Sequence, residues 1–113
     1  MRKYTMTPLP NGPFTGLDAI SRLCYGIILD RVKLSTMRRD SHFFDEGMNT
    51  FYALYRQRDL AYELGVSERT VRRCLQELGE RELIHWVKFG YQGASRFYLM
   101  PAGIEYLSAQ ENQ

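Results

Sequence analysis

Cysteine is scarce in this sequence, and its scarcity excludes two kinds of architecture. Only two of the 113 residues are cysteines, Cys24 and Cys74, and only two are histidines. None of these four residues stand at the short spacings typical of zinc sites, and two thiols are too few for a disulfide framework. Both cysteines fall within apolar helical patterns, so we expect buried, reduced thiols, no metal and no cofactor.

Long apolar runs are missing as well. The longest one, near residues 24–29, is far too short to span a bilayer, and the first residues do not form a signal peptide. We therefore expect a cytoplasmic protein with no membrane partner. Hydrophobic residues make up 44% and charged residues 25% of the chain, which is typical of one folded domain with a modest core.

Catalytic signatures are also absent. Asp40, Ser41 and His42 are the residue types of a catalytic triad, but triad members converge in space and are not normally neighbours in sequence. The chain has no Gly-rich phosphate loop and no evident pair of catalytic acids. We expect no enzymatic activity, no catalytic residue and no small-molecule ligand.

The N-terminal half predicts an irregular arm, a helix and a hairpin. Residues 1–16 hold three of the four prolines and predict an irregular N-terminal arm, followed by a single domain over residues 17–113. Apolar residues recur at helical spacing from Leu17 to Val32 and predict a first helix. After a polar segment, the aromatic, β-prone residues 43–44 and 50–55 flank a turn-like Asp-Glu-Gly sequence and predict a hairpin.

Residues 57–78 fit the helix-turn-helix template. Ala61 is small where the two helices cross, Gly65 supplies the positive φ that ends the first helix, and Ser67 is a good N-cap for the second. A chance pair of amphipathic helices would rarely meet these requirements together. The positions that we expect to be buried are Leu60, Leu64, Val66, Val71, Cys74, Leu75 and Leu78.

The C-terminal residues predict a second hairpin and a last helix. Two β-prone runs, 83–88 and 96–100, surround a Gly-containing loop, and a hairpin in this place after a helix-turn-helix is a wing. Pro101 suits the first turn of a final helix, with Ile104 and Leu107 as its apolar positions. The predicted fold class is α+β: a winged helix-turn-helix with a preceding hairpin, a C-terminal wing and a short final helix.

The net charge is only +2, so nucleic-acid binding has to be argued from where the charges lie. A helix turns about 100° per residue, which places Arg69, Arg73 and Gln76 opposite the predicted buried stripe. The N-terminal half of this face is basic, as in a recognition helix that enters the major groove by its N-terminus. We expect arginine to read guanine, Gln76 to read adenine, and Ser67 with the first-turn amides to hold a phosphate.

The predicted contacts with double-stranded DNA extend beyond this face. Lys88 and Arg96 lie near the two ends of the predicted wing, and Gln92 and Ser95 lie in its tip. Arg56, at the start of the motif, is a candidate contact to the DNA backbone. The complete set of predicted DNA-binding residues is Arg56, Ser67, Arg69, Thr70, Arg72, Arg73, Gln76, Lys88, Gln92, Ser95 and Arg96.

Simpler interpretations stay open at this point. The arginines of the second helix can form a solvated face in which each pairs with a nearby glutamate, and the wing tip can be a plain polar turn. A winged helix can also bind a promoter as a transcriptional regulator, or serve only protein contacts. If the chain binds DNA, its low net charge favours two domains acting together, so we expect a homodimer formed through the first or the last helix.

Several stretches of the sequence together are typical of one family. They are residues 23–35 (LCYGIILDRVKLS), the Phe-Phe-Asp-Glu-Gly turn of residues 43–47, and the strand that leads directly into the helix-turn-helix. The Leu83-Ile84 step and the closing Arg96-Phe97-Tyr98 strand belong to the same pattern. In these residues the chain resembles the N-terminal domain of plasmid replication initiator A proteins of Gram-positive bacteria.

The resemblance covers about residues 4–100 and implies a winged helix that binds repeated double-stranded sites in a replication origin. Recognition by the second helix and the wing carries over to Ser67, Arg69, Thr70, Arg73, Gln76 and the loop up to Arg96. The wing of this chain is less basic than is common in the family. Family initiators carry a further C-terminal region, for which no residues remain here, so we expect an N-terminal domain or a short relative.

Overall fold

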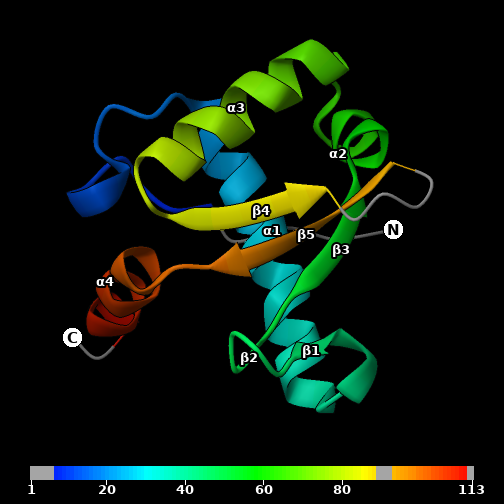
Figure 1. Cartoon of the computed structure of the whole chain (residues 1–113). Helices are drawn as coiled ribbons and strands as arrows, with labels where there is room; N and C mark the ends of the chain where they lie inside the picture. The colour runs from blue at the N-terminus through cyan, green and yellow to red at the C-terminus, as the bar shows by residue number, and fades with distance from the viewer. Residues whose placement is uncertain (1–6, 89–92, 112–113) are drawn as a thin grey trace.

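In a computed structural model of the chain, which describes residues 7–88 and 93–111, the longest element is helix α1 (Ala19–Arg38) (Figure 1). The Asp18 carboxylate caps its N-terminus by accepting a hydrogen bond from the Ser21 backbone N–H at 2.9 Å. Arg39, in the left-handed region at φ 49°, ends the helix. The helix continues well past Val32, where the predicted apolar pattern stops. Its last turns lie outside the core and carry little apolar periodicity, so the sequence pattern did not indicate them.

The helix-turn-helix predicted from residues 57–78 is formed by α2 (Gln57–Leu64) and α3 (Glu68–Glu80). Gly65 ends α2 with a φ of 71°, and the Ser67 side chain caps α3 by accepting a hydrogen bond from the Thr70 backbone N–H at 3.2 Å. Both caps were expected. The buried stripe of α3 is also confirmed, since four side chains have no exposed surface: Val71, Cys74, Leu75 and Leu78.

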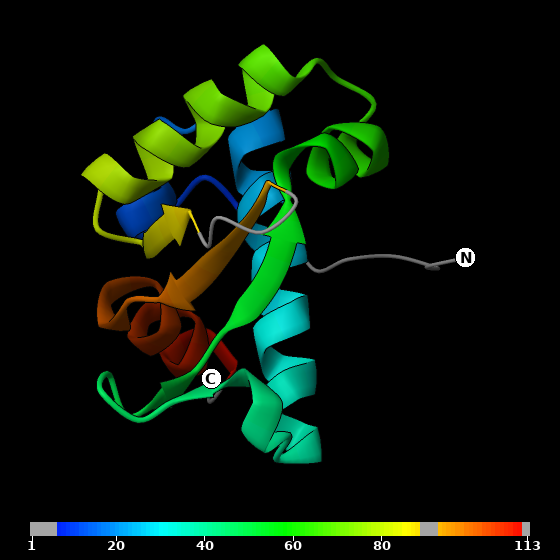
Figure 2. The same cartoon turned by 45° about the vertical axis from the view of Figure 1, so that its right-hand side comes forward.

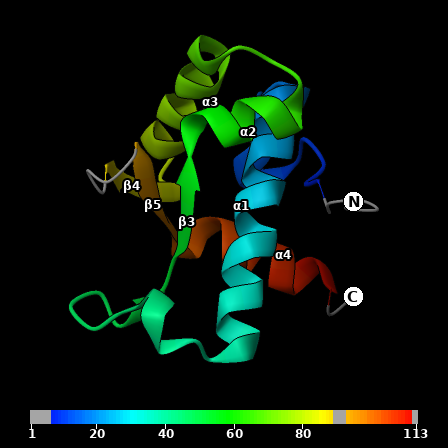
Figure 3. The same cartoon turned by 90° about the vertical axis from the view of Figure 1, so that its right-hand side faces the viewer.

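Helices α1, α2 and α3 pack against one another near the N-terminal end of α1. Helices α2 and α3 both pack against α1 near its N-terminal half, and the small hairpin of β1 (Phe44–Asp45) and β2 (Thr50–Phe51) lies at the other end (Figures 2 and 3). Cys24 of α1 and Cys74 of α3 are both buried free thiols, as predicted. Burial, followed by the proximity of Cys74, raises the pKa of the Cys24 thiol to about 12.

A three-stranded antiparallel sheet covers the core in the order β3 (Ala53–Arg56), β5 (Ala94–Leu99), β4 (Ile84–Lys88). Strands β4 and β5 are consecutive and pair from Ile84 opposite Leu99 to Lys88 opposite Ser95. Trp86 of β4 faces Phe97 of β5, and their rings are stacked with centroids 6.1 Å apart. The described residues thus form an α+β architecture of four α-helices and small antiparallel sheets, compatible with a winged helix.

The strand predicted over residues 50–55 is in fact two strands. Strand β2 (Thr50–Phe51) pairs with β1 (Phe44–Asp45), which follows the short 3-10 helix η2 (Ser41–Phe43), whereas β3 pairs with β5 in the other sheet. Between β2 and β3, the buried Tyr52 places its ring 5.7 Å from that of Tyr98. A continuous β-prone run does not reveal a change of partner, because both halves have the same residue preferences.

The expected N-terminal arm is only partly irregular. It contains a 3-10 helix, η1 (Gly12–Phe14), and Phe14 is completely buried in the hydrophobic core. Its ring contacts Tyr25 edge-on, with centroids 4.9 Å apart. The proline and glycine content of this segment predicted its irregular backbone but did not indicate that Phe14 anchors it to the core.

Helix α4 (Pro101–Glu111) begins at the predicted proline, and Leu107, one of its two predicted apolar positions, packs against the core. Its buried residue, however, is not one of those two. Ile104, expected to face the core, is 38% exposed, whereas Gly103 is buried. The absence of a side chain lets α4 lie directly on Tyr25: a Cβ atom at Gly103 would be 2.6 Å from the Tyr25 hydroxyl oxygen. Among the described residues, no helix has both the length and the apolar character needed to cross a bilayer.

We predict that Gly103→Ala destabilises the protein by about 1–3 kcal/mol, because the added methyl group overpacks the contact with Tyr25. Gly79→Ala in α3 is the matched control, since its Cβ would meet its nearest neighbour, the Trp86 Nε1 atom, at an ordinary 3.9 Å. That control should gain up to about 1 kcal/mol from helix propensity. Urea unfolding of both variants measures the two effects, and equal signs would contradict the close approach at Gly103.

Candidate nucleic-acid interface

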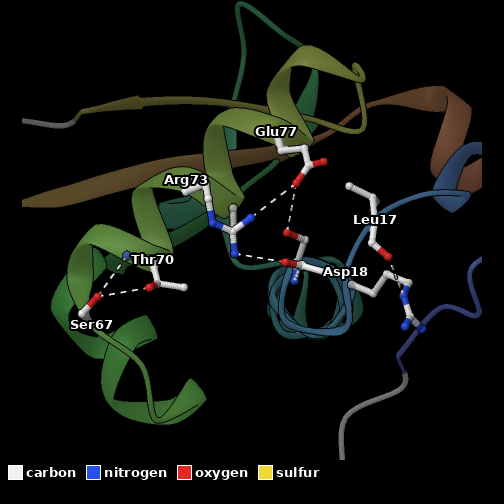
Figure 4. Close-up of polar contacts among 9 residues, drawn as sticks. Leu17, Asp18, Ser67, Thr70, Arg73 and Glu77 are labelled. Atoms are coloured by element: carbon white, nitrogen blue, oxygen red, sulfur yellow. Dashed lines mark hydrogen bonds and ion pairs between the residues drawn. The ribbon is translucent and has the colours of Figure 1, made fainter.

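The N-terminal turn of α3 presents an exposed polar surface. The Ser67 hydroxyl lies 3.1 Å from the Thr70 hydroxyl and accepts the Thr70 backbone N–H, so the two side chains are fixed relative to each other (Figure 4). Ser67 is exposed and Thr70 half-buried. The remaining first-turn amides and the positive end of the helix dipole suit an anionic ligand such as a phosphate.

Arg69 and Arg72 extend from this same half of α3. Both are exposed, and among the residues that the structure describes neither forms an ion pair. Arg69 lies almost opposite the buried stripe, and Arg72 lies on one flank. These two guanidinium groups are therefore available to an outside partner, as the sequence predicted.

The side chain of Arg73 was predicted to point away from the protein, but it contacts two acidic side chains. Its Nη2 atom donates a hydrogen bond to the Asp18 carboxylate at 3.1 Å, and its Nη1 atom lies 3.7 Å from a carboxylate oxygen of Glu77. The side chain still has 51% of its surface exposed. The flank of α3 that carries Arg73 faces the start of α1, so the long side chain reaches the carboxylate that caps that helix (Figure 4).

The contact of Arg73 belongs to a network that joins α1 and α3. The fully buried Ser21 donates its backbone N–H to one oxygen of Asp18 and its hydroxyl to Glu77 at 3.4 Å. The hydrogen bond from Ser21 is the main cause that holds the pKa of Asp18 below its ordinary value, and Arg73 adds to it. Both carboxylates beside the guanidinium are therefore fixed by the same serine.

The C-terminal half of the α3 face is less available than its N-terminal half. The Gln76 amide donates to a carboxylate oxygen of Glu80 at 3.4 Å, although the side chain is exposed. This contact is weak in geometry and can be exchanged for one to a base.

The alternative interpretation, in which the arginines of α3 pair with nearby acidic side chains, applies to Arg73. It does not apply to Arg69 or Arg72, which form no ion pair among the described residues.

The β4–β5 hairpin contains residues of very different accessibility. Lys88, at the end of β4, is exposed, as predicted. Ser95, predicted in the tip, instead lies inside β5 opposite Lys88 and is completely buried, so it cannot contact DNA in this arrangement. The strand begins two residues earlier than the sequence indicated, at Ala94, which draws Ser95 into the sheet. Gln92 lies outside the described residues.

Arg96 is held by the protein rather than presented at the wing. Its guanidinium carbon lies 4.6 Å from the ring centroid of Tyr52, and its Nη1 atom is 3.8 Å from the Asp45 carboxylate. Asp45 also accepts a hydrogen bond from the Tyr98 hydroxyl at 2.7 Å, which is the main cause that lowers the pKa of Asp45. Arg96 thus joins β5 to the β1–β2 hairpin, a structural role that the sequence did not predict.

Arg56 and the outer face of α2 complete the surface. Arg56 precedes α2 and forms an ion pair with Asp59 at 3.2 Å, with 34% of its side chain exposed. Arg58 and Tyr62 are both exposed, Tyr62 to 88%, and neither belongs to the set of DNA-binding residues predicted from the sequence. They are four residues apart and so share one face of α2. An aromatic residue on the outer side of a short amphipathic helix is the signal that could have identified them.

Three solved structures share this fold over almost the whole chain, each with a TM-score of 0.65 and 19% identity. One, described as the N-terminal domain of a DNA-binding protein, is matched over 97% of this chain and 87% of its own. Another, described as an MDR initiator, is matched over 98% and 91%, and a third, described as a Rep–DNA complex, over 97% and 88%. No protein-family model and no curated protein matches the sequence.

These neighbours share the α+β fold described above, which is compatible with the winged helix that the resemblance to replication initiators implied. At 19% identity the likeness concerns the fold and not the individual contacts.

We predict that the Asp18 carboxyl group titrates below the usual value of about 4 and still does so in the Arg73→Ala variant. The reason is that the Ser21 N–H is the larger cause of the lowered pKa, and it remains in the variant. Because the folded-state pKa is depressed, Asp18 stabilises the fold above about pH 4 and loses this contribution as the pH falls through the depressed value. Carboxyl NMR titration measures both proteins, and a return to the ordinary pKa in Arg73→Ala would contradict this order of causes.

Proposed function

We propose that the chain binds double-stranded DNA sequence-specifically at a plasmid-type replication origin, as the N-terminal domain or a short relative of a replication initiator. The observation that carries the proposal is the pair of exposed arginines without an ion pair among the described residues, Arg69 and Arg72, on the N-terminal half of α3. Support for the setting comes from neighbours of the same fold described as an initiator and as a Rep–DNA complex. In this proposal the chain binds and performs no chemistry.

In the proposed complex, α3 enters the major groove by its N-terminus. Arg69, opposite the buried stripe, offers a guanidinium fork to guanine, and Arg72 on the flank meets a phosphate. Ser67 and the neighbouring amides hold a second phosphate at the start of the helix. Gln76 exchanges its long contact with Glu80 for an adenine edge.

The DNA backbone on either side of this groove is contacted by other elements. Lys88, at the end of β4, meets a phosphate in the manner of a wing residue. Arg58 and Tyr62 of α2 face the other side, where the first helix of such a motif crosses the backbone. Arg56 is a weaker contributor because it must first leave Asp59. Ser95 and Arg96 are left out of the proposed interface.

The competing function is a winged helix used only for protein contacts. The pairing of Arg73 and Gln76 with acidic side chains favours this alternative, because paired side chains are less available to DNA. Binding to an operator as a transcriptional regulator would use the same residues as origin binding. Duplex affinity separates the first alternative from the proposal, and the genomic position of the preferred sequence separates the second.

We further propose that two copies of the chain pair through a groove between α1 and α4. The groove, about 420 Å³ in volume, is lined mainly by apolar side chains, and two of them are unusually accessible for their type: Met37 is 79% and Ile104 38% exposed. Its continuation carries charges of both signs, Lys33 and Glu111. A surface with both signs at its rim is self-complementary across a two-fold axis, which favours a second copy as the occupant.

The DNA proposal predicts that Arg69→Ala loses about 1–3 kcal/mol of affinity for a duplex selected from a random-sequence library, and that it relaxes base preference. Lys88→Ala should weaken all duplexes about equally and flatten the salt dependence by about one phosphate contact. Fluorescence anisotropy over a series of salt concentrations measures both. Arg38→Ala, at the far end of α1, is the control with the same loss of charge and should change little.

If the wild-type chain bound no duplex even at low salt, the DNA proposal would be wrong and the protein-contact function preferred. If Arg38→Ala weakened binding as much as Arg69→Ala, the basic charge would matter but not its position on α3.

The dimer proposal predicts that Met37→Glu converts a dimer into a monomer in sedimentation equilibrium, because it places a charge in the apolar groove. Met48→Glu is the matched control, since Met48 is also exposed, to 45%, but lies in the β1–β2 turn outside the groove. A wild-type chain that is monomeric at high concentration, or a dimer unaffected by Met37→Glu, would overturn this surface.

A further inference from the structure

The guanidinium of Arg73 is held in one position by groups from two helices. Asp18 of the α1 N-cap accepts a hydrogen bond from its Nη2 atom at 3.1 Å, and Glu77, one turn along α3, lies 3.7 Å from its Nη1 atom. The side chain nevertheless keeps 51% of its surface exposed. Arg73 is therefore fixed in place and still accessible, unlike Arg96, which is covered by Tyr52 and 29% exposed.

The carboxylate that holds Arg73 is itself fixed. One oxygen of Asp18, Oδ1, accepts the Ser21 backbone N–H at 2.9 Å, and the other, Oδ2, accepts the Arg73 hydrogen bond. The fully buried Ser21 also holds Glu77 through its hydroxyl group. An exposed ion pair usually contributes little to stability, because two flexible side chains must be ordered to form it. Here the helix cap has already ordered the acidic partner, so the cost falls on Arg73 alone.

The hydrogen bond to Asp18 leaves Arg73 able to recognise a further group. A guanidinium has five N–H donors, and the Nη2 atom of Arg73 donates to the Asp18 carboxylate and, at 3.7 Å, to the Cys74 sulfur. The bond to sulfur is long, so an N–H of Nη2 can exchange it for a stronger acceptor. The remaining donors can reach the O6 and N7 acceptors of a guanine, which two N–H groups of one arginine bind together. An arginine ordered before it meets DNA loses less rotamer entropy on binding.

We infer that Asp18 is a positioning residue for sequence recognition: it fixes Arg73 against the N-terminus of α1 so that the free donors of its guanidinium read a guanine in the major groove. The inference rests on the proposed DNA binding by α3. It assigns to the first helix, which lies outside the helix-turn-helix, a part in the choice of sequence. Asp18 acts through Arg73 and does not itself contact a base.

Simple electrostatics predicts the opposite effect of Asp18. A carboxylate at the DNA-facing side repels phosphates, so its neutralisation should tighten binding to every duplex. If Asp18 positions Arg73, its neutralisation instead weakens binding to the preferred duplex while binding to unrelated duplexes tightens slightly. The two effects have opposite signs on the preferred duplex, and this difference makes the inference testable with one substitution.

The test is Asp18→Asn in the full chain, measured against a duplex selected from a random-sequence library by the wild-type protein. Asparagine remains a good N-cap, so α1 should be retained, and circular dichroism with thermal unfolding verifies this. We expect about a tenfold loss of affinity for the selected duplex and a loss of preference for guanine at one base pair. Affinity for a scrambled duplex should stay equal or rise.

Two further variants isolate the contact between Asp18 and Arg73. Asp40→Asn removes the same charge from another capping aspartate, which accepts the His42 N–H beyond the C-terminal end of α1, and it should leave base preference intact. In an Arg73→Ala background, Asp18→Asn should no longer reduce base preference, because the side chain that it positions is gone.

The outcomes separate this inference from the proposed function. If the wild-type protein selects no sequence, the proposed function fails and the inference falls with it. If the wild type selects a sequence and Asp18→Asn keeps both its affinity and its guanine preference, the inference alone is overturned. Tighter binding of Asp18→Asn to the selected duplex would also overturn it, as would an equal loss with Asp40→Asn.

Discussion

The burial of one apolar stripe of α3 against the rest of the core determines most of what this protein presents to the outside. Val71, Cys74, Leu75 and Leu78 have no exposed surface, so the rotation of α3 about its axis is fixed. That rotation turns Arg69 outward and brings the Arg73 flank over the start of α1. The same packing therefore leaves Arg69 without an ion pair among the described residues and orders Arg73 through its contacts with Asp18 and Glu77. The candidate interface is a consequence of the core rather than an addition to it.

The parts of the fold that were predictable from sequence are those determined by neighbours in the chain. The positive φ of Gly65, the cap at Ser67 and the period of the α3 stripe each depend on a few consecutive residues, and all three are confirmed. The contact of Arg73 with Asp18 joins residues 55 positions apart, and no local pattern indicates it. The change of strand partner at Tyr52 was missed for the same reason.

The number of basic residues in the sequence exceeds the number available to a partner. Arg96 is held between Tyr52 and Asp45, and Arg56 pairs with Asp59. In α1, Arg22 donates to two backbone carbonyl groups of the segment that precedes the helix, and Arg31 lies over the Tyr55 ring. Such arginines join elements through hydrogen bonds and contacts with aromatic rings, which sequence alone does not distinguish from surface charge. This explains why a candidate site drawn from charge patterning included residues that the fold uses internally.

The two buried thiols can be used to detect opening of the packing between α1 and α3. Cys24 and Cys74 belong to the two helices whose packing orients the candidate interface, and both are covered completely. A thiol with a pKa near 12 hardly reacts at neutral pH, because the thiolate is the reactive form. Both side chains are buried in the packing of these helices, so alkylation of either thiol requires that α1 and α3 separate. The alkylation rate in a dilute reagent would measure how often the packing between α1 and α3 opens, and no engineered label is needed.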